Sequence, residues 1–170
     1  MGDILRPIDV YQVPDNPFKA IADDWMLVTA GDINSFNTMT ASWGTMGELW
    51  HKKICICFVR PNRHTYNFLE NTDSFTLTFF PEKYRDVLKL CGTKSGRDID
   101  KMGGIGLTPI KSPTGSVYFE EARLVFECKK IYIHDLDPGN FIDRTIEKEY
   151  PQKDYHRMYI GEIVGCWLKD

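Results

Sequence analysis

The sequence predicts a mainly β protein, an antiparallel barrel or sandwich with a few inserted helices. Aromatic and β-branched runs recur at short intervals between turn residues, a pattern typical of many short strands. Helical patterns are few. No Gly-x-Gly-x-x-Gly motif follows a predicted strand, so the sequence does not support a doubly wound sheet with a nicotinamide site.

The bulk properties are those of one globular domain. The chain has 170 residues and a net charge of −3, so we expect a single domain over 1–170 and no nucleic-acid partner. No apolar run approaches the roughly 20 residues that span a bilayer, and residues 1–12 lack the features of a signal peptide. We therefore expect no membrane association and a cytoplasmic location.

Five segments are predicted to be strands. Residues 24–31 and 36–44 flank a turn rich in Gly, Asp and Asn, which predicts a hairpin. The next strands are expected at 54–59 and at 74–80, where Phe and Leu alternate with Ser and Thr. The last strand is 157–168.

The long segment 116–136 has room for two strand segments. Its apolar phase shifts across Lys129 and Lys130. Such a shift predicts a β-bulge or a bend at that point.

Three helices are expected. A short one covers 65–71. The clearest pattern is 81–92, where Pro81 suits the first turn, apolar residues recur at spacings of three and four, and Gly92 suits the C′ position. A third helix is expected within 139–151, ending before Pro151.

Cysteine and histidine usage points away from disulfides and metals. The five cysteines are an odd number without a metal-like spacing, so we expect small, buried core thiols. The four histidines have no zinc-like spacing, and no nucleophile has a partnered base. We expect no metal site and no catalytic side chain.

Three clusters carry candidate chemistry. Residues 37–44, Asn-Thr-Met-Thr-Ala-Ser-Trp-Gly, are either a strand with a hydroxylated solvent face or a wall for a flat polar heterocycle. Residues 60–65, Arg-Pro-Asn-Arg-His-Thr, are either a solvated basic turn, capped by Asn62 or Thr65, or an anion site.

The third cluster is Cys-Gly-Thr-Lys-Ser-Gly-Arg-Asp-Ile-Asp-Lys at 91–101. It lacks the Walker A spacing. If the cluster is a junction between two helices, Ser95 caps a short second helix, which ends at Gly103 and Gly104. That interpretation leaves the cations Lys94, Arg97 and Lys101 unexplained, and they favour a phosphate site.

These clusters, in this order and together with "HRMYIGEIVG" at 156–165, resemble the flavin reductase-like family and its flavoredoxin-type branch. The resemblance extends from about Trp25 to Val164. It implies a six-stranded antiparallel Greek-key split barrel with flanking helices. We expect about 20 N-terminal residues to form an extension or arm. It also implies a homodimer with FMN near the subunit interface.

The resemblance further implies which residues bind FMN. The strand 37–43 would run along the isoalloxazine, with Thr40, Ala41 and Ser42 at its polar edge. The arginines of the second cluster and Thr65 would reach the ribityl chain or the phosphate, and the third cluster would complete the phosphate site. The implied cofactor-binding residues are Asn37, Thr38, Met39, Thr40, Ala41, Ser42, Trp43, Arg60, Arg63, Thr65, Ser95, Gly96, Arg97 and Lys101.

By this resemblance the protein is an FMN-dependent flavoprotein, a flavin reductase or a flavoredoxin-type electron carrier. NAD(P)H or an electron-transfer protein would supply the electrons. A non-catalytic barrel that binds or stores flavin is the alternative. An oligonucleotide-binding barrel is disfavoured by the net charge of −3.

Overall fold

The structure, a computed structural model, describes residues 4–169. Its main sheet has eight strands, every neighbouring pair of which is antiparallel. The order is β3-β2-β6-β9-β10-β5-β4, and β1 also pairs with β10. These strands are β1 (Leu5–Pro7), β2 (Met26–Asp32), β3 (Ser35–Ala41), β4 (Gly44–Leu49), β5 (Lys52–Val59), β6 (Ser74–Phe79), β9 (Leu124–Asp135) and β10 (Arg157–Lys169).

A separate two-stranded sheet is formed by β7 (Pro109–Lys111) and β8 (Val117–Phe119). Within residues 4–169 there are three α-helices, α1 (Pro17–Lys19), α2 (His64–Glu70) and α3 (Arg85–Thr93). Short 3-10 or π turns make up the rest of the helical structure: η1 (Val10–Gln12), η2 (Ala20–Asp24), η3 (Glu82–Tyr84), η4 (Pro138–Asn140) and η5 (Arg144–Glu149).

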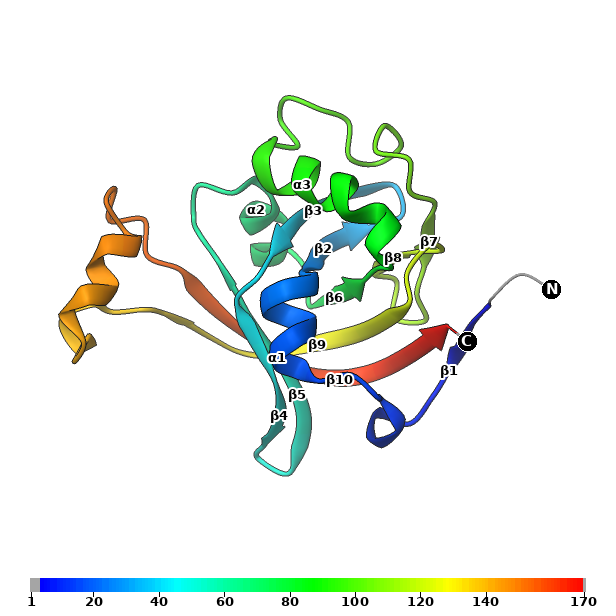
Figure 1. Ribbon diagram of the computed structural model, residues 1–170, viewed down its shortest axis with the longest axis horizontal. Helices are drawn as coiled ribbons and strands as arrows, with labels where there is room; N and C mark the ends of the chain where they lie inside the picture. Colours follow the sequence, from blue (N-terminus) through cyan, green and yellow to red (C-terminus); the bar gives the residue numbers. More distant parts are fainter. Residues whose placement is uncertain (1–3, 170) are drawn as a thin grey trace.

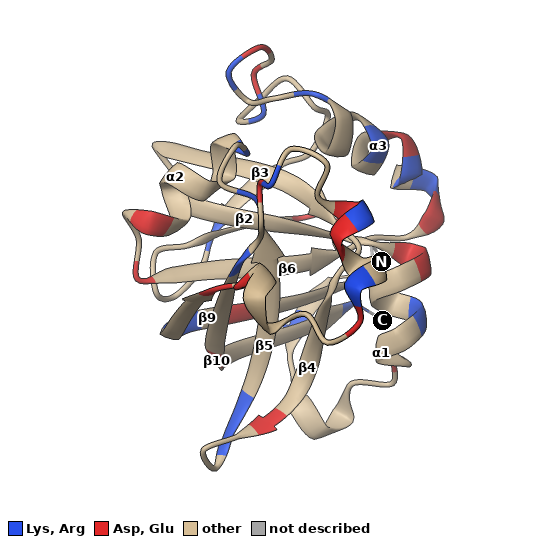
Figure 2. Cartoon of the chain, turned by 90° about the vertical axis from the view of Figure 1, so that its left-hand side faces the viewer, with Lys and Arg blue, Asp and Glu red and all other residues tan. Residues whose placement is uncertain are grey.

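The sheet curls into a barrel-like body, and α2 and α3 lie over β2 and β3 (Figure 1). The segment between β9 and β10 projects away from this body as an arm that carries η4 and η5 (Figure 1). Figure 2 shows acidic and basic residues interspersed along α3. Among the described residues, no helix combines the length and apolarity needed to cross a bilayer.

The mainly β, antiparallel prediction is confirmed, but the sheet has more strands than the six expected. β1 was missed because it has only three residues, of which two are exposed. β4 was missed because its sequence, Gly-Thr-Met-Gly-Glu-Leu, contains two glycines and lacks a clear apolar run. That the chain is a single domain, with about 20 N-terminal residues as an extension, stays a prediction.

The predicted irregularity in the 116–136 segment is present. The chain breaks at 120–123 into β8 and β9, and a bulge follows within β9. Ile160 pairs with Tyr132 and Gly161 with Lys130, so Ile131 is the extra residue. The bulge lies next to Lys129 and Lys130, where the apolar phase shifts.

The helices differ from the sequence prediction at several places. Helix α3 begins at Arg85, after the 3-10 turn η3, and the helix expected within 139–151 is instead the two 3-10 turns η4 and η5. Helix α3 continues through Gly92 and has Lys94 as its C-cap, so Gly92 is not the C′ residue. No helix follows Ser95, where residues 96–106 form turns and bends. Neither Asn62 nor Thr65 caps α2, whose N-cap is Arg63 without a side-chain bond. Polar turn residues compete with the backbone for hydrogen bonds, which makes such ends hard to assign.

Two apolar clusters form the core. One fills the barrel and includes Phe75, Leu77 and Phe126, and the other lies between β2 and α3 and includes Leu27 and Leu88. All five cysteines are free and buried, as the sequence predicts. They are Cys55, Cys57, Cys91, Cys128 and Cys166.

Candidate functional site

Two adjoining cavities open where β3, the β5–α2 connection and the segment after α3 meet. Met39 and Arg63 line both of them. The first cavity, of about 180 Å³, is lined by Met39, Thr40, Ala41, Ser42, Trp43, Phe58, Arg60, Arg63 and His156. The second, of about 300 Å³, is lined by Asn37, Met39, Asn62, Arg63, His64, Thr65, Thr93, Lys94, Ser95, Gly96 and Lys101.

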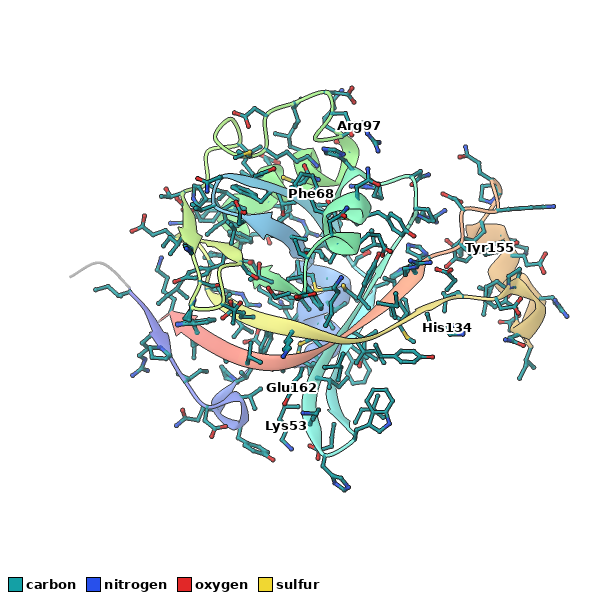
Figure 3. The ribbon with its side chains drawn as sticks, turned by 180° about the vertical axis from the view of Figure 1, so that it is seen from behind. Lys53, Phe68, Arg97, His134, Tyr155 and Glu162 are labelled. Carbon is teal, nitrogen blue, oxygen red and sulfur yellow. The ribbon has the colours of Figure 1, made fainter. Side chains whose placement is uncertain are left out.

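The structure brings together almost all the residues that the sequence nominated. Only Thr38 and Arg97 line neither cavity. The Thr38 hydroxyl is buried 2.8 Å from Thr29 Oγ1. Arg97 donates from Nη1 to the Asn62 carbonyl oxygen at 3.4 Å and lies near the N-terminal end of α2 (Figure 3).

The first cavity has an aromatic side. Trp43 is 43% exposed, and its ring centroid lies 5.1 Å from that of His156. The Thr40 hydroxyl donates to the Leu88 carbonyl oxygen at 2.5 Å, so this side chain holds α3 against β3. Because the hydroxyl proton of Thr40 is used in this bond, Ser42 is the lining residue of β3 and its end whose hydroxyl can still donate to a ligand, beside the side chains of Arg60, Arg63 and His156.

Arg60 lies in the first cavity, away from Ser95 and Lys101. Its guanidinium donates to Asp154 Oδ1 and to the Glu149 carbonyl oxygen, both at 2.8 Å, and lies 4.9 Å from the Tyr150 ring centroid. These contacts fasten the arm to the β5–α2 connection.

His156 is a site residue that the sequence analysis missed. It is buried, and its Nδ1 lies 2.8 Å from the Tyr150 hydroxyl. Burial and, less strongly, the charge of Arg60 lower the pKa of His156 to about 4, so the ring is neutral at pH 7. No local pattern identified it, because the arm brings it to the cavity.

The second cavity is cationic. Arg63, Lys94 and Lys101 line it, and no Asp or Glu stands among its described lining residues. Arg63 donates to the carbonyl oxygens of Gly92 and Cys91 at 3.0 and 3.2 Å. Desolvation lowers the pKa of Arg63, which still leaves it charged at pH 7.

Lys101 is almost completely buried, with 3% of its surface exposed. Its Nζ donates to the carbonyl oxygens of Thr38 at 2.9 Å and of Cys91 at 3.0 Å. Desolvation, with a smaller contribution from the charge of Arg63, lowers the pKa of Lys101 to about 8. A buried cation without a carboxylate partner is costly, and an anion in the cavity would offset that cost.

Asn37, Thr65 and Gly96 form a tightly packed wall. Asn37 Nδ2 donates to Thr65 Oγ1 at 2.7 Å. A Cβ at Gly96 would lie 1.9 Å from Asn37 Oδ1. Only glycine therefore lets the segment after α3 approach β3 this closely.

One polar atom of the second cavity's lining is unsatisfied. His64 Nδ1 is buried and has no hydrogen-bond partner. Buried polar atoms are rarely unpaired in proteins. The unpaired nitrogen lies within the wall of the cavity. The buried ammonium and the absence of lining carboxylates fit an anion of phosphate size, and the first cavity beside it offers an aromatic face. The site fits the FMN that the resemblance implies.

The fold and the site thus define an antiparallel split barrel with a cavity lined by cationic side chains. The model of the flavin reductase-like domain family matches residues 18–170. The chain belongs to the flavin reductase-like family. A search of curated protein sequences found no match.

Solved structures with the same fold are similar over most of the chain. Flavoredoxin of Desulfovibrio vulgaris (Miyazaki F) is 23% identical, with 85% of this chain and 68% of that chain covered and a TM-score of 0.65. An FMN-binding domain of a flavin reductase-like enzyme from Shewanella baltica is 14% identical, with 99% of this chain and 79% of that chain covered and a TM-score of 0.70. The NADH:FAD oxidoreductase SgcE6 of Streptomyces globisporus is 14% identical, with 86% of this chain and 77% of that chain covered and a TM-score of 0.64. At these identities the similarity establishes the fold.

Proposed function

We propose that the protein is an FMN-dependent oxidoreductase of the flavin reductase or flavoredoxin type. The isoalloxazine would occupy the first cavity and the phosphate the second. The observation that carries this proposal is the adjoining pair of cavities, one with an aromatic side and the other lined by cations without carboxylates. FMN rather than FAD is favoured because Lys101 and the unpaired His64 suit a terminal phosphate dianion.

When bound, FMN supplies the hydride and electron transfer chemistry. The chain's own residues bind and orient it. Trp43 offers a face for the ring, and the backbone and hydroxyl of Ser42 face its polar edge. Arg63 and Lys101 hold positive charge where the phosphate would lie. His156, held through Nδ1 by Tyr150, packs beside Trp43 in the wall of the first cavity.

The reductant in this proposal is NAD(P)H or an electron-transfer protein. Anaerobic mixing of the FMN-loaded protein with NADH and with NADPH tests it. Loss of the oxidised flavin absorbance on mixing supports a reductase. If neither nucleotide bleaches the flavin, reduction by an electron-transfer protein is tested next, and failure of both identifies a storage or binding barrel.

The proposal that the second cavity binds the phosphate is tested by comparing the affinities for FMN and for riboflavin. Lys101→Ala is expected to weaken FMN binding at least tenfold, and Arg97→Ala, whose side chain lies outside the cavity lining, to weaken it less. Both should leave riboflavin binding almost unchanged, because riboflavin lacks the phosphate. Lys89→Ala, on the exposed side of α3, is the matched control. Equal FMN affinity in all four proteins would refute the phosphate assignment.

The proposal includes a homodimer and a cytoplasmic location. The arm and the neighbouring end of β9 expose Tyr132, Ile133, Ile142 and Ile146, and exposed apolar side chains of this kind mark interaction surfaces. Five free thiols suit a reducing compartment. Analytical ultracentrifugation decides the oligomeric state, with Ile142→Asp and Ile146→Asp expected to weaken association.

A further inference from the structure

We propose that His64 couples phosphate binding to proton uptake: the ring is neutral when the second cavity holds no anion and becomes an imidazolium hydrogen-bond donor when a phosphate dianion enters. The inference rests on the proposed function, because the dianion is taken to be the phosphate of FMN. It predicts that FMN binds more tightly as the pH falls, through a residue that the binding motifs do not require.

The position of His64 supports this role. The residue lines the second cavity together with Lys101 and Ser95, and its Nδ1 is buried without a partner. The ring is held edge-to-face by Phe68, with centroids 5.2 Å apart and planes at 89°. It also lies against Gly96, whose added Cβ would be 3.1 Å from His64 Cδ2. The ring is therefore fixed at the cavity wall.

The charges around the ring oppose its protonation. Burial is the main cause that lowers the pKa of His64, and the charges of Arg97 and Lys101 lower it further. Arg63 and Lys94 add positive charge to the same cavity. The residues of β3 and α2 that line the cavity with His64, namely Asn37, Met39 and Thr65, are uncharged, as is Phe68, which packs against the ring. Asp98 and Asp100 belong to the segment after α3 but do not line the cavity.

A phosphate dianion reverses this field. It brings about two negative charges next to the ring, and an opposite charge within a few ångströms raises the pKa of a histidine. Anion binding and protonation then favour each other by thermodynamic linkage. Each unit by which the bound anion raises the pKa of His64 strengthens binding about tenfold at pH values below both pKa values.

A purely structural His64 makes a different prediction. As an aromatic residue that only packs against Phe68 and Gly96, it would leave the pH dependence of FMN binding to the phosphate, whose own second pKa is about 6. The titration of the phosphate itself contributes equally to FMN binding by the wild type and by a His64→Gln variant. It therefore cancels when the pH dependences of the two proteins are compared. His51→Gln, in the exposed β4–β5 turn, is the matched control.

The experiment is calorimetric titration of FMN and of riboflavin between pH 5.5 and 8.5 in buffers of different ionisation enthalpy. We expect the wild type and His51→Gln to take up more protons per FMN than His64→Gln. Their FMN affinity, relative to that of His64→Gln, should rise about tenfold from pH 8 to pH 6. Riboflavin affinity should show no such difference.

A second measurement is independent of the variant's stability. The proton resonances of the His64 ring, titrated in the wild type with and without inorganic phosphate, report its pKa directly. A rise in the pKa when phosphate is added supports the inference.

The outcomes separate the inference from the proposed function. If FMN binds better than riboflavin but proton uptake is the same with and without His64, or if phosphate leaves the pKa of His64 unchanged, the inference is wrong and the proposed function stands. If neither flavin binds, the proposed function is refuted and the inference with it.

Discussion

The ammonium group of Lys101 lies 2.9 Å from the carbonyl oxygen of Thr38 and 3.0 Å from that of Cys91. One buried side chain thereby links the segment after α3 both to strand β3 and to the C-terminal turn of α3. The cation of the second cavity is thus held by backbone carbonyls, without a carboxylate. This arrangement keeps positive charge in the cavity, at a cost in desolvation.

That cost predicts a pH dependence of stability. Burial lowers the pKa of Lys101 from 10.5 to about 8, so between pH 8 and 10.5 the unfolded chain binds more protons than the folded one. Stability contributed by this group therefore rises with pH in that window. From pH 7.5 to 9.5, the free energy of unfolding of the wild type should rise by about 2 kcal/mol more than that of Lys101→Met.

Urea unfolding at the two pH values measures this difference. Other groups that titrate in the same window are common to both proteins and cancel in the comparison. Lys89→Met, whose side chain is exposed on α3, should behave like the wild type. Parallel pH profiles for wild type and Lys101→Met would show that Lys101 is not desolvated as described.

The close approach of Gly96 to Asn37 predicts a severe effect from a single methyl group. In Gly96→Ala the Cβ would meet Asn37 Oδ1 at 1.9 Å and displace the amide that donates to Thr65. We expect a loss of about 1–3 kcal/mol in the free energy of unfolding and a weaker affinity for FMN. Gly47→Ala, whose Cβ meets nothing within 4 Å, should stay within about 0.5 kcal/mol of the wild type. Equal stability of the two variants would contradict the packing argument.

His156 predicts sensitivity to acid. Its pKa in the folded protein is about 4, lowered by burial and by Arg60, against about 6.5 in the unfolded chain. As the pH falls from 6.5 to 4, the unfolded chain takes up a proton that the folded chain does not, so stability is lost. Between pH 7 and pH 5 the wild type should lose about 2 kcal/mol more than His156→Gln.

Chemical denaturation at pH 7 and pH 5 tests this expectation. His51→Gln should retain the full acid loss of the wild type, because His51 lies in an exposed turn. An identical acid loss in His156→Gln and in the wild type would mean that another group is responsible.

The fold could be predicted from the sequence where each strand carries its own apolar pattern. β6 alternates Phe and Leu with Ser and Thr. β2 and β3 flank a turn rich in Gly, Asp and Asn, which are the residues that favour a hairpin. The sequence could not reveal β1 as a strand, because its three residues are ordered by pairing with residues 167–169 of β10. That pairing is a long-range contact, which local propensity does not encode.

The candidate site could be predicted from its motifs but not from its packing. The segments 37–43 and 93–101 line the cavities, except for Thr38 and residues 97–100. His156 and Phe58 escaped prediction because they reach the first cavity through the arm and through β5. The Thr38 hydroxyl was wrongly expected at the ligand. Side chains alternate along β3, and that of Thr38 lies on the side that faces Thr29.

Thr40 and Ser42 can now be separated experimentally. The Thr40 hydroxyl donates to the Leu88 carbonyl oxygen, so Thr40→Val should lower the free energy of unfolding by about 1 kcal/mol, and Thr40→Ser should retain most of the stability. Ser42 is half-buried at the wall of the first cavity, so Ser42→Ala should leave stability unchanged and weaken FMN binding or shift its reduction potential. Thermal unfolding and flavin titration of the three variants check this division. Weaker FMN binding in Thr40→Val but not in Thr40→Ser, with Ser42→Ala unaffected, would reverse the two roles.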